Sequence, residues 1–148
     1  MKLSTKGRYG TRAMLELALD YKKGPVLLRE IAQRQEISER YLERMMTALV
    51  SAGLVRSSRG KHGGFTLAKP PGEIRLSQVI QAVEGSIAPS LCVDDPKVCD
   101  RVDICITRDI WKRLKKSMLD TLDSITLENM VEMQKNKLAK PEARMYYI

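Results

Sequence analysis

Residues 30–65 constrain the fold of this chain more than any other stretch, because they combine two helical patterns with a hairpin. The first helical pattern is short, and Ile31 and Ala32 form its apolar side. Ser38 then stands where it can cap a second helix over residues 39–50. In that second helix, apolar residues recur at spacings of three and four, which predicts a single buried face. These residues are Leu42, Met45, Met46, Leu49 and Val50.

A short hairpin is predicted directly after the second helix. Gly53 ends the helix, and residues 54–56 and 65–67 have the composition of two short strands. The connecting residues 57–64 are rich in glycine and basic side chains. A helix–turn–helix followed by a basic hairpin is a winged helix, in which one helix enters a DNA major groove and the hairpin lies beside a minor groove.

The distribution of charge supports a nucleic-acid face in the N-terminal half. The chain has 148 residues and a net charge of +8. Residues 1–75 contain 15 Lys and Arg against 7 Asp and Glu, whereas residues 76–148 contain 11 of each group. The entire excess therefore belongs to the half that holds the winged helix, as expected of a DNA-binding unit joined to a neutral appendage.

A helix over residues 5–21 is predicted before the helix–turn–helix. Its buried stripe is Ala13, Met14, Leu17, Ala18 and Tyr21. Ser4, Lys6 and Arg8 lie at its start, where backbone amides and cations suit a DNA phosphate. A short strand over residues 26–28 is predicted to lead into the next helix.

The region after the wing is predicted to hold a helix and then a long loop. Ser77 caps the helix, and Gly85 ends it. Residues 86–103 are predicted to form a loop without regular structure, which is longer than compact domains usually contain without a functional reason.

A long amphipathic helix over residues 104–122 follows the loop. Its apolar stripe is Ile106, Ile110, Leu114, Met118, Leu122 and Ile125, with Trp111 and Leu119 beside it. Thr126 caps a second helix over residues 127–134, and a polar, frayed tail begins at Lys135. We expect the long helix to pack both on its own domain and against a second copy, because a symmetric dimer presents two recognition helices to a two-fold operator.

Three cysteines, Cys92, Cys99 and Cys105, lie within fourteen residues. Thiolates bind zinc or iron–sulfur clusters, and a loop lets several of them converge on one centre. The spacing is unlike that of a zinc ribbon, and a fourth ligand must come from another residue, such as a nearby carboxylate. Inert thiols and a reversible thiol switch are the alternatives. The odd number argues against a disulfide framework.

The sequence offers little for an enzyme or a membrane protein. It contains no nucleophile elbow, no phosphate-binding glycine loop before a helix and no paired carboxylates of recognisable spacing. The single histidine, His62, lies in the wing and is better explained by DNA than by catalysis. Because no apolar run is long enough to span a bilayer and no signal peptide is recognisable, we expect a cytoplasmic protein. Because the catalytic motifs are missing, we expect no small-molecule substrate.

Several stretches together resemble the IscR/NsrR-type family of bacterial winged-helix transcription regulators, over nearly the whole chain. These stretches are Leu3-Ser-Thr-Lys-Gly-Arg-Tyr-Gly, Gly24-Pro25-Val26, Ile37-Ser38 with Tyr41-Leu42-Glu43, Gly53-Leu54-Val55, Arg59-Gly60 with Gly63-Gly64-Phe65, and Ile125-Thr126-Leu127. The three cysteines stand where the cluster-binding members carry theirs, so the resemblance is strongest to the iron–sulfur cluster regulators.

The resemblance implies a homodimeric, DNA-binding regulator that is controlled by its cluster. The DNA-facing positions of the family's recognition helix match Ser38, Arg40, Tyr41 and Arg44. A position that influences base preference matches Glu43. An arginine that enters a minor groove matches Arg59. Cys92, Cys99 and Cys105 would ligate an iron–sulfur cluster. The family's histidine after the third cysteine is missing here, and Asp109 is the suggested substitute. Another branch uses an aspartate near the N-terminus, where this chain has Arg8.

We therefore predict a mostly helical fold with a small β-hairpin wing, in which a winged helix-turn-helix is joined to a long C-terminal dimerisation helix. The expected divisions are a DNA-binding domain (1–85), a cluster-binding loop (86–105), dimerisation helices (106–136) and a flexible tail (137–148). The expected cofactor is an iron–sulfur cluster, 2Fe–2S in preference to 4Fe–4S, and the expected partners are double-stranded DNA and a second copy of the chain. The expected DNA-binding residues are Ser4, Lys6, Arg8, Arg29, Ser38, Arg40, Tyr41, Glu43, Arg44, Arg59, Lys61 and His62.

Three alternatives keep other functions open. A zinc-stabilised regulator and a regulator switched by thiol oxidation would share the DNA-binding fold. A protein-interaction module that controls a metabolic enzyme would use the chain differently, because substitution of its DNA-facing arginines would leave its function intact.

Overall fold

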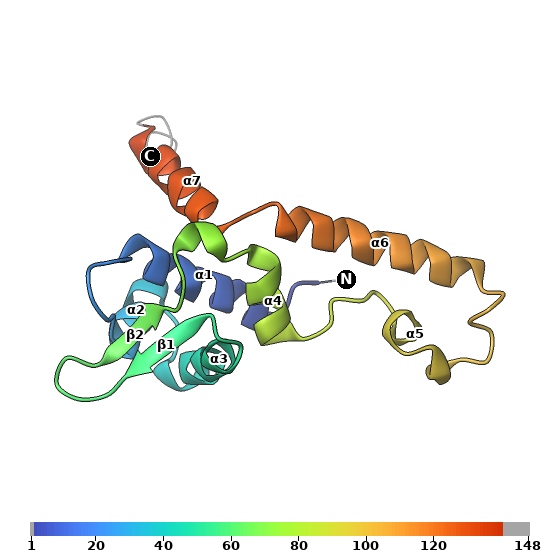
Figure 1. Ribbon diagram of the computed structural model, residues 1–148, viewed down its shortest axis with the longest axis horizontal. Coiled ribbons are helices and arrows are strands. Elements are labelled where there is room, and N and C mark those ends of the chain that lie inside the picture. Colours follow the sequence, from blue (N-terminus) through green and yellow to red (C-terminus); the bar gives the residue numbers. More distant parts are fainter. Residues whose placement is uncertain (1, 141–148) are drawn as a thin grey trace, which may run out of the picture.

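The computed structural model describes residues 2–140 of the chain. Figure 1 shows an N-terminal lobe made of α1 to α4 and a two-stranded hairpin. The chain leaves this lobe after α4 and returns to it along α6, and α7 begins at the lobe and points away from it. The elements in chain order are α1 (Thr5–Leu19), α2 (Leu28–Gln35), α3 (Glu39–Ser51), β1 (Val55–Ser58), β2 (Gly64–Leu67), η1 (Pro71–Glu73), α4 (Leu76–Glu84), α5 (Leu91–Asp94), η2 (Pro96–Val98), α6 (Ile106–Asp123) and α7 (Leu127–Ala139).

One hydrophobic core lies inside the lobe and joins the helices of the predicted winged helix. The predicted stripes of α1 and α3 both face it, with Tyr21 and Val50 at its margin. The largest side chains that are almost fully enclosed are Met14, Ile31, Leu42, Met46, Leu49, Ile74, Ile80, Leu127 and Val79. Aliphatic and methionine side chains thus build this core, as the scarcity of aromatic residues in the sequence suggests.

The turn between α2 and α3 is set by local chemistry. Glu36 adopts a left-handed conformation with φ 53° directly after α2. Ile37 is buried, and the Ser38 hydroxyl accepts a hydrogen bond from the Tyr41 backbone amide at 3.3 Å, which caps α3. Gly53, with φ 72°, follows the end of α3. The predicted helix–turn–helix is therefore confirmed.

The hairpin that follows is antiparallel, and its register pairs Val55 with Leu67 and Ser58 with Gly64. The prediction of a strand over residues 26–28 was wrong. Only Val26 pairs with the sheet, through reciprocal backbone hydrogen bonds with Phe65 of 2.9 and 2.8 Å. The strand does not extend because the backbone turns directly into α2.

The start of α4 also differs from the prediction that Ser77 is its cap. Arg75 is the capping residue, and its backbone amide donates to the Gln78 side chain at 2.9 Å. Ser77 lies inside the helix, where it is buried and donates its hydroxyl to the Asp123 carboxylate at the end of α6. The hydroxyl is therefore used in a tertiary contact, which the local sequence pattern did not indicate.

The segment between α4 and α6 is more ordered than predicted. Residues 86–103 contain α5 and the 3-10 turn η2, which begins at Pro96. Each is about one turn long, too short to give a recognisable periodicity. Figure 1 shows α5 alongside the N-terminal half of α6, away from the lobe.

The junction between α6 and α7 is fastened to the lobe. The Leu76 amide donates to the Ile125 carbonyl at 2.8 Å, and the Leu127 amide donates to the Ile74 carbonyl at 3.0 Å. Thr126 caps α7 as predicted, by accepting a hydrogen bond from Asn129.

The C-terminal end corrects a second boundary. Helix α7 continues through Ala139, so residues 135–139 are helical and do not form the predicted polar tail. The remainder of that tail, residues 141–148, lies outside the described residues. The prediction ended the helix at Gln134 because the following side chains are mostly polar. In the structure these residues are helical but exposed, so they need no apolar pattern.

Candidate nucleic-acid interface and cysteine segment

Helix α3 divides cleanly into a buried and an exposed face. Leu42, Met45, Met46 and Leu49 are buried in the core. The opposite face holds exposed polar and charged side chains, namely Arg40, Glu43, Arg44 and Thr47. The predicted base-facing and phosphate-facing positions thus lie on a capped helix whose polar side is open to solvent.

Tyr41 differs from its neighbours because it is partly buried. Its ring meets Tyr9 of α1 edge to face, with centroids 5.9 Å apart and planes at 89°. The guanidinium groups of Arg8 and Arg12 lie 5.8 and 5.6 Å from the centroid of the Tyr9 ring, within cation–π range. Tyr9 therefore brings the predicted residue Arg8 to the beginning of α3.

Sequence reasoning missed Tyr9 and Arg12 as members of this surface. Arg12 donates from Nε to the Gln35 side chain at 2.6 Å and from Nη2 to the Gln35 backbone carbonyl at 2.9 Å. This bidentate contact fixes an exposed cation between α1 and the end of α2. The spacing of Arg8 and Arg12, one helical turn apart, was the available signal.

The wing carries exposed cations on a tight turn. Arg59, Lys61 and His62 are exposed near its tip. The turn closes through a hydrogen bond of 3.0 Å from the Gly63 amide to the Gly60 carbonyl. A Cβ atom at Gly63 would overlap the Ser58 carbonyl oxygen, so the turn requires glycine at this position.

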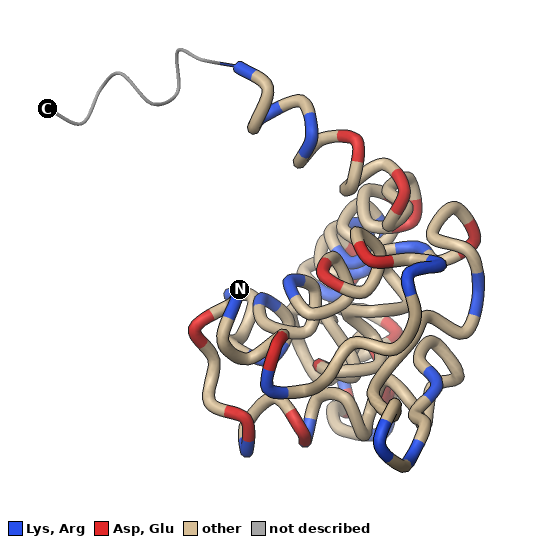
Figure 2. Tube along the Cα trace, turned by 90° about the vertical axis from the view of Figure 1, so that its left-hand side faces the viewer, with Lys and Arg blue, Asp and Glu red and all other residues tan. Residues whose placement is uncertain are grey.

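The remaining predicted DNA-binding residues lie at two helix N-termini. Arg29 is exposed in the first turn of α2 and lines a shallow depression that also includes Glu39, the first residue of α3. Lys6 is exposed at the start of α1, and Ser4 is half-buried there. Figure 2 shows that basic and acidic positions both occur along the trace. The excess of basic residues nevertheless lies in residues 1–75.

The sequence suggested that backbone amides at the start of α1 could bind a phosphate. In the structure these amides have partners within the chain. Oε1 of Glu84 accepts hydrogen bonds from the Ser4 amide at 3.0 Å and from the Gly7 amide at 2.9 Å. The Lys6 amide donates to the Ser4 hydroxyl at 3.1 Å. The carboxylate occupies the positive end of the helix itself, so Lys6 and Arg8 can offer only their side chains to a phosphate.

The three cysteines occupy different environments along one segment. Cys92 is half-buried, with its sulfur 3.3 Å from the Ser90 hydroxyl, and Cys99 is exposed. Cys105 directly precedes the first residue of α6, and its sulfur lies 3.2 Å from the Thr107 hydroxyl. Hydrogen bonds from that hydroxyl and from the Arg108 backbone amide lower the pKa of Cys105, which favours its thiolate.

The thiols are not gathered around one point. Among residues 2–140, the His, Cys, Asp and Glu side chains form no group of three that could hold a metal ion. Asp109, the suggested fourth ligand, faces Lys112, with 3.8 Å between its Oδ1 and the lysine Nζ. The donor types suit iron and sulfide, but their convergence on one cluster requires a rearrangement of the segment that carries them.

Two cations hold residues 86–105, called the cysteine segment below, against α6. Arg108 donates from Nε to the Cys92 carbonyl at 2.7 Å, and Lys115 forms an ion pair of 2.6 Å with Asp94. The Ser86 hydroxyl also donates to Asp94. The hydrogen bond from Lys115, together with that from Ser86, lowers the pKa of Asp94.

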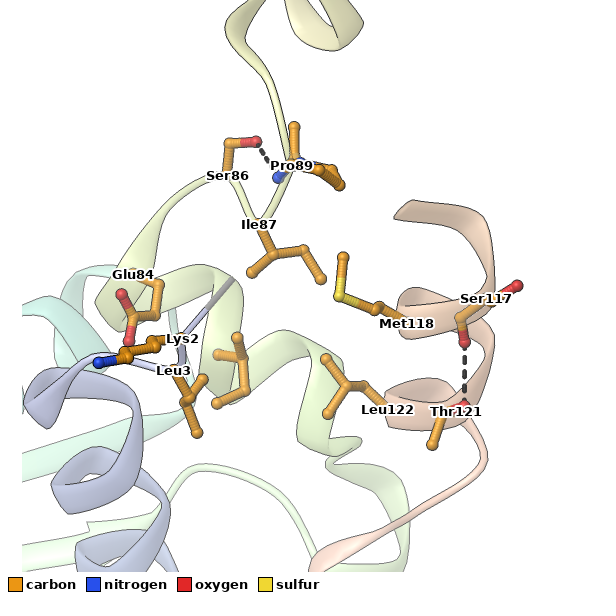
Figure 3. Close-up of a pocket in the computed structure, with 12 residues that line it drawn as sticks. Lys2, Leu3, Glu84, Ser86, Ile87, Pro89, Ser117, Met118, Thr121 and Leu122 are labelled. Atoms are coloured by element: carbon orange, nitrogen blue, oxygen red, sulfur yellow. Dashed lines mark hydrogen bonds between the residues drawn. The ribbon is translucent and has the colours of Figure 1, made fainter. Parts of the chain in front are cut away.

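Helix α6 leaves much of its predicted apolar stripe uncovered. Every residue of the helix retains at least partial exposure. Ile106, Ile110 and Trp111 in its N-terminal half are 73%, 50% and 36% exposed. In the C-terminal half, Met118 and Leu122 are half-buried and line a cavity of about 590 Å³. Figure 3 shows this cavity between α6, the end of α4 and the N-terminal residues. The helix thus packs on its own lobe at one end only.

The comparisons with known proteins identify the family. The family model described as Rrf2, an iron-dependent transcriptional regulator, matches residues 3–133. The chain belongs to the Rrf2 family. The predicted resemblance is confirmed, and members of the Rrf2 family regulate transcription. Within residues 2–140, none of the helices is long and apolar enough to cross a membrane.

Individual Rrf2 relatives cover most of this chain. The HTH-type transcriptional regulator IscR of Pectobacterium carotovorum is 41% identical over 131 residues, which are 88% of this chain and 79% of IscR. The structure of IscR of T. potens is 39% identical, with a TM-score of 0.75, and the match covers 98% of this chain and 92% of that one. The structure of CymR, described as the global cysteine regulator of B. subtilis, is 38% identical, with a TM-score of 0.74, and the match covers 90% and 98%. These likenesses confirm the winged-helix fold. The chain is similar to both IscR and the cysteine regulator CymR, so the family alone does not specify the controlling signal.

Proposed function

We propose that this Rrf2 regulator represses transcription by binding a two-fold operator as a homodimer, and that an iron–sulfur cluster held by its three cysteines controls the binding. The observation that carries the DNA-binding part is the division of α3 into an anchored apolar face and an exposed face with Arg40, Glu43 and Arg44. Side chains on the exposed face of such a helix can reach base edges in a major groove.

The wing and α1 supply the contacts on either side of the recognition helix. Arg59 at the wing tip is suited to a narrow minor groove, where the negative potential attracts a guanidinium. Lys6, Arg8 and Lys61 are exposed cations that would bind phosphates and contribute affinity without sequence preference. Arg12 is a further candidate, because it is exposed, is held by Gln35, and shares the Tyr9 ring with Arg8.

The uncovered half of α6 supports the homodimer. Ile106, Ile110 and Trp111 form an exposed apolar stripe at the end of the helix that its own lobe does not reach. A second copy related by a two-fold axis would bring the same stripe to this surface. The dimer would also present two α3 helices to two half-sites.

The cysteine segment is the proposed control element. Cys92, Cys99 and Cys105 would ligate the cluster, and a fourth donor would complete its coordination. When bound, the cluster would supply a redox-sensitive and iron-dependent link between the two ends of the segment. Because the three thiols lie apart in the structure, ligation would require residues 91–104 to leave their contacts with Arg108 and Lys115.

The DNA-binding part is tested by fluorescence anisotropy on a duplex that the wild-type chain selects from a random-sequence library. Arg44→Ala and Arg59→Ala should each weaken binding by about 5- to 150-fold, the effect of removing a base interaction of about 1–3 kcal/mol. Arg113→Ala, an exposed arginine of α6, is the matched control and should change affinity little. Normal binding by both of the first two variants would contradict the docking model.

The cluster is tested on protein purified without oxygen. We expect visible absorption with matched counts of iron and acid-labile sulfide, both abolished in Cys92→Ala. The iron count per chain also distinguishes 2Fe–2S from 4Fe–4S. A colourless, iron-free protein from iron-replete cells would refute the cluster and leave the DNA-binding proposal unaffected.

A thiol switch is the second candidate for the control element. It is favoured by the separation of the thiols and by the exposure of Cys99, both of which suit oxidation of individual cysteines better than convergence. Reversible loss of operator binding when metal-free protein is treated with peroxide would support this candidate. Unchanged binding after the same treatment would exclude it.

A further inference from the structure

Glu84 joins two parts of the molecule that the sequence does not connect. It is the last residue of α4 and lies at the N-terminus of α1, where its Oε1 accepts hydrogen bonds from the Ser4 amide, the Ser4 hydroxyl and the Gly7 amide. Figure 3 shows Glu84 beside Lys2 and Leu3. A carboxylate in this place is favoured by the unpaired amides and by the positive end of the helix dipole.

Two glycines of α1 make this close approach possible. A Cβ atom at Gly7 would lie 2.5 Å from Oε1 of Glu84, and one at Gly10 would lie 3.0 Å from a methyl group of Val83. Both glycines lie inside a helix, where glycine is a poor choice for helix stability. Their presence is explained by the crossing of α1 and the last turn of α4, which leaves no room for a side chain.

The other side of Glu84 leads directly to the cysteine segment. Gly85 follows and ends α4 with φ 79°, a backbone conformation that favours glycine. The next residue, Ser86, donates its hydroxyl to Asp94, which also pairs with Lys115 of α6. Residues 84–86 therefore contact the start of α1 on one side and the cysteine segment on the other.

We propose that Glu84 is a positioning residue through which the cysteine segment controls the placement of Lys6 and Arg8 on DNA. The proposal rests on the function proposed above. A rearrangement of residues 86–94 pulls on Gly85 and withdraws the carboxylate from the Ser4 and Gly7 amides. The first turn of α1 then loses its cap, and the two cations are no longer held where they meet phosphates.

The test uses the full chain and the library-selected duplex, with operator affinity measured over a series of salt concentrations. The slope of log K against log salt falls by about 0.9 for each phosphate that the protein no longer neutralises. We expect Glu84→Ala to reduce the slope by about 1–2, because Lys6 and Arg8 are both released. Glu84→Gln retains an acceptor oxygen and should restore most of the slope. Glu132→Ala, an exposed carboxylate of α7, controls for the change in net charge.

A double-mutant comparison separates positioning from general destabilisation. Lys6→Ala should lower the slope in the wild-type background and add little in the Glu84→Ala background. Additive effects of the two substitutions would overturn the proposal. Gly7→Ala provides a second test if Glu84→Ala folds poorly, since it displaces the carboxylate without removing it. A wild-type slope in Gly7→Ala would also count against the proposal.

The link to the cysteines has its own readout. For the wild type, the ratio of operator affinities before and after alkylation of the thiols measures the response of DNA binding to the segment. Glu84→Ala should bring this ratio close to one. A Glu84→Ala protein with the ratio and salt slope of Glu132→Ala would refute the coupling while leaving the proposed function standing. If the wild type selects no duplex, both proposals fail together.

Discussion

Arg34→Ala should destabilise the lobe by weakening the contact between α1 and α2. In the structure, Arg34 Nη1 lies 3.2 Å from Glu16 Oε2 and 2.7 Å from Asp20 Oδ2. The Glu16 side chain is only 10% exposed, so removal of Arg34 leaves a nearly buried carboxylate with Gln35 as its remaining partner. The contact bears on the helix–turn–helix, because α2 packs against both α1 and α3.

The size of the effect lies between two limits. Exposed ion pairs contribute about 0.2–1 kcal/mol, whereas breaking a buried pair costs about 3–5 kcal/mol. Arg34 is 47% exposed, which screens its charge and places the expected loss of unfolding free energy at about 2 kcal/mol. For a chain of this length the melting temperature should fall by about 4–8 °C. Lys23→Ala is the matched control, since its Nζ lies 3.5 Å from the same Asp20 and its side chain is 71% exposed.

The effect should also depend on pH. The hydrogen bond from Arg34 lowers the pKa of Asp20 below its ordinary value of 3.8. A lowered pKa in the folded state contributes stability that is present above the unfolded value and is lost as the pH falls through the folded value. The difference between wild type and Arg34→Ala, measured by urea unfolding, should therefore be full at neutral pH and shrink below pH 3.8. Equal stability of Arg34→Ala and Lys23→Ala at pH 7 would refute this reasoning.

Three further predictions concern the recognition helix, the wing and the core. Ser38→Ala removes the cap of α3 and should lower the unfolding free energy by about 1 kcal/mol in urea; an unchanged midpoint would contradict the capping role. Gly63→Ala places a Cβ atom against the Ser58 carbonyl oxygen and should weaken operator binding by distorting the wing, with the melting temperature less affected than the affinity. Leu127→Ala empties a fully buried site and should cost about 2.7–5 kcal/mol. Leu138→Ala, at a residue 72% exposed, should stay within about 0.5 kcal/mol of wild type, and similar losses in both variants would indicate that α7 does not support the core.

Helix faces and helix caps could be predicted from the amino-acid sequence, because they depend on residues that are close together in the chain. The buried face of α3 repeats every three or four residues, Ser38 lies next to the helix that it caps, and Thr126 lies next to α7. Each signal involves residues within about one helical turn, so the pattern of side chains already contains the contact. The winged-helix fold and the exposed positions of α3 could therefore be predicted. The three cysteines could be grouped on one segment for the same reason.

Which distant groups meet became clear only from the folded chain. Glu84 lies 80 residues from Ser4 in the sequence, and their contact depends on how α1 and α4 cross at Gly7 and Gly10. The same holds for the hydroxyl of Ser77, which serves Asp123 instead of the helix terminus that its local sequence suggested. Each of these polar groups could form hydrogen bonds of similar strength with several different partners. The choice among them is made by the packing of the apolar core, which brings some partners within reach and keeps the others away.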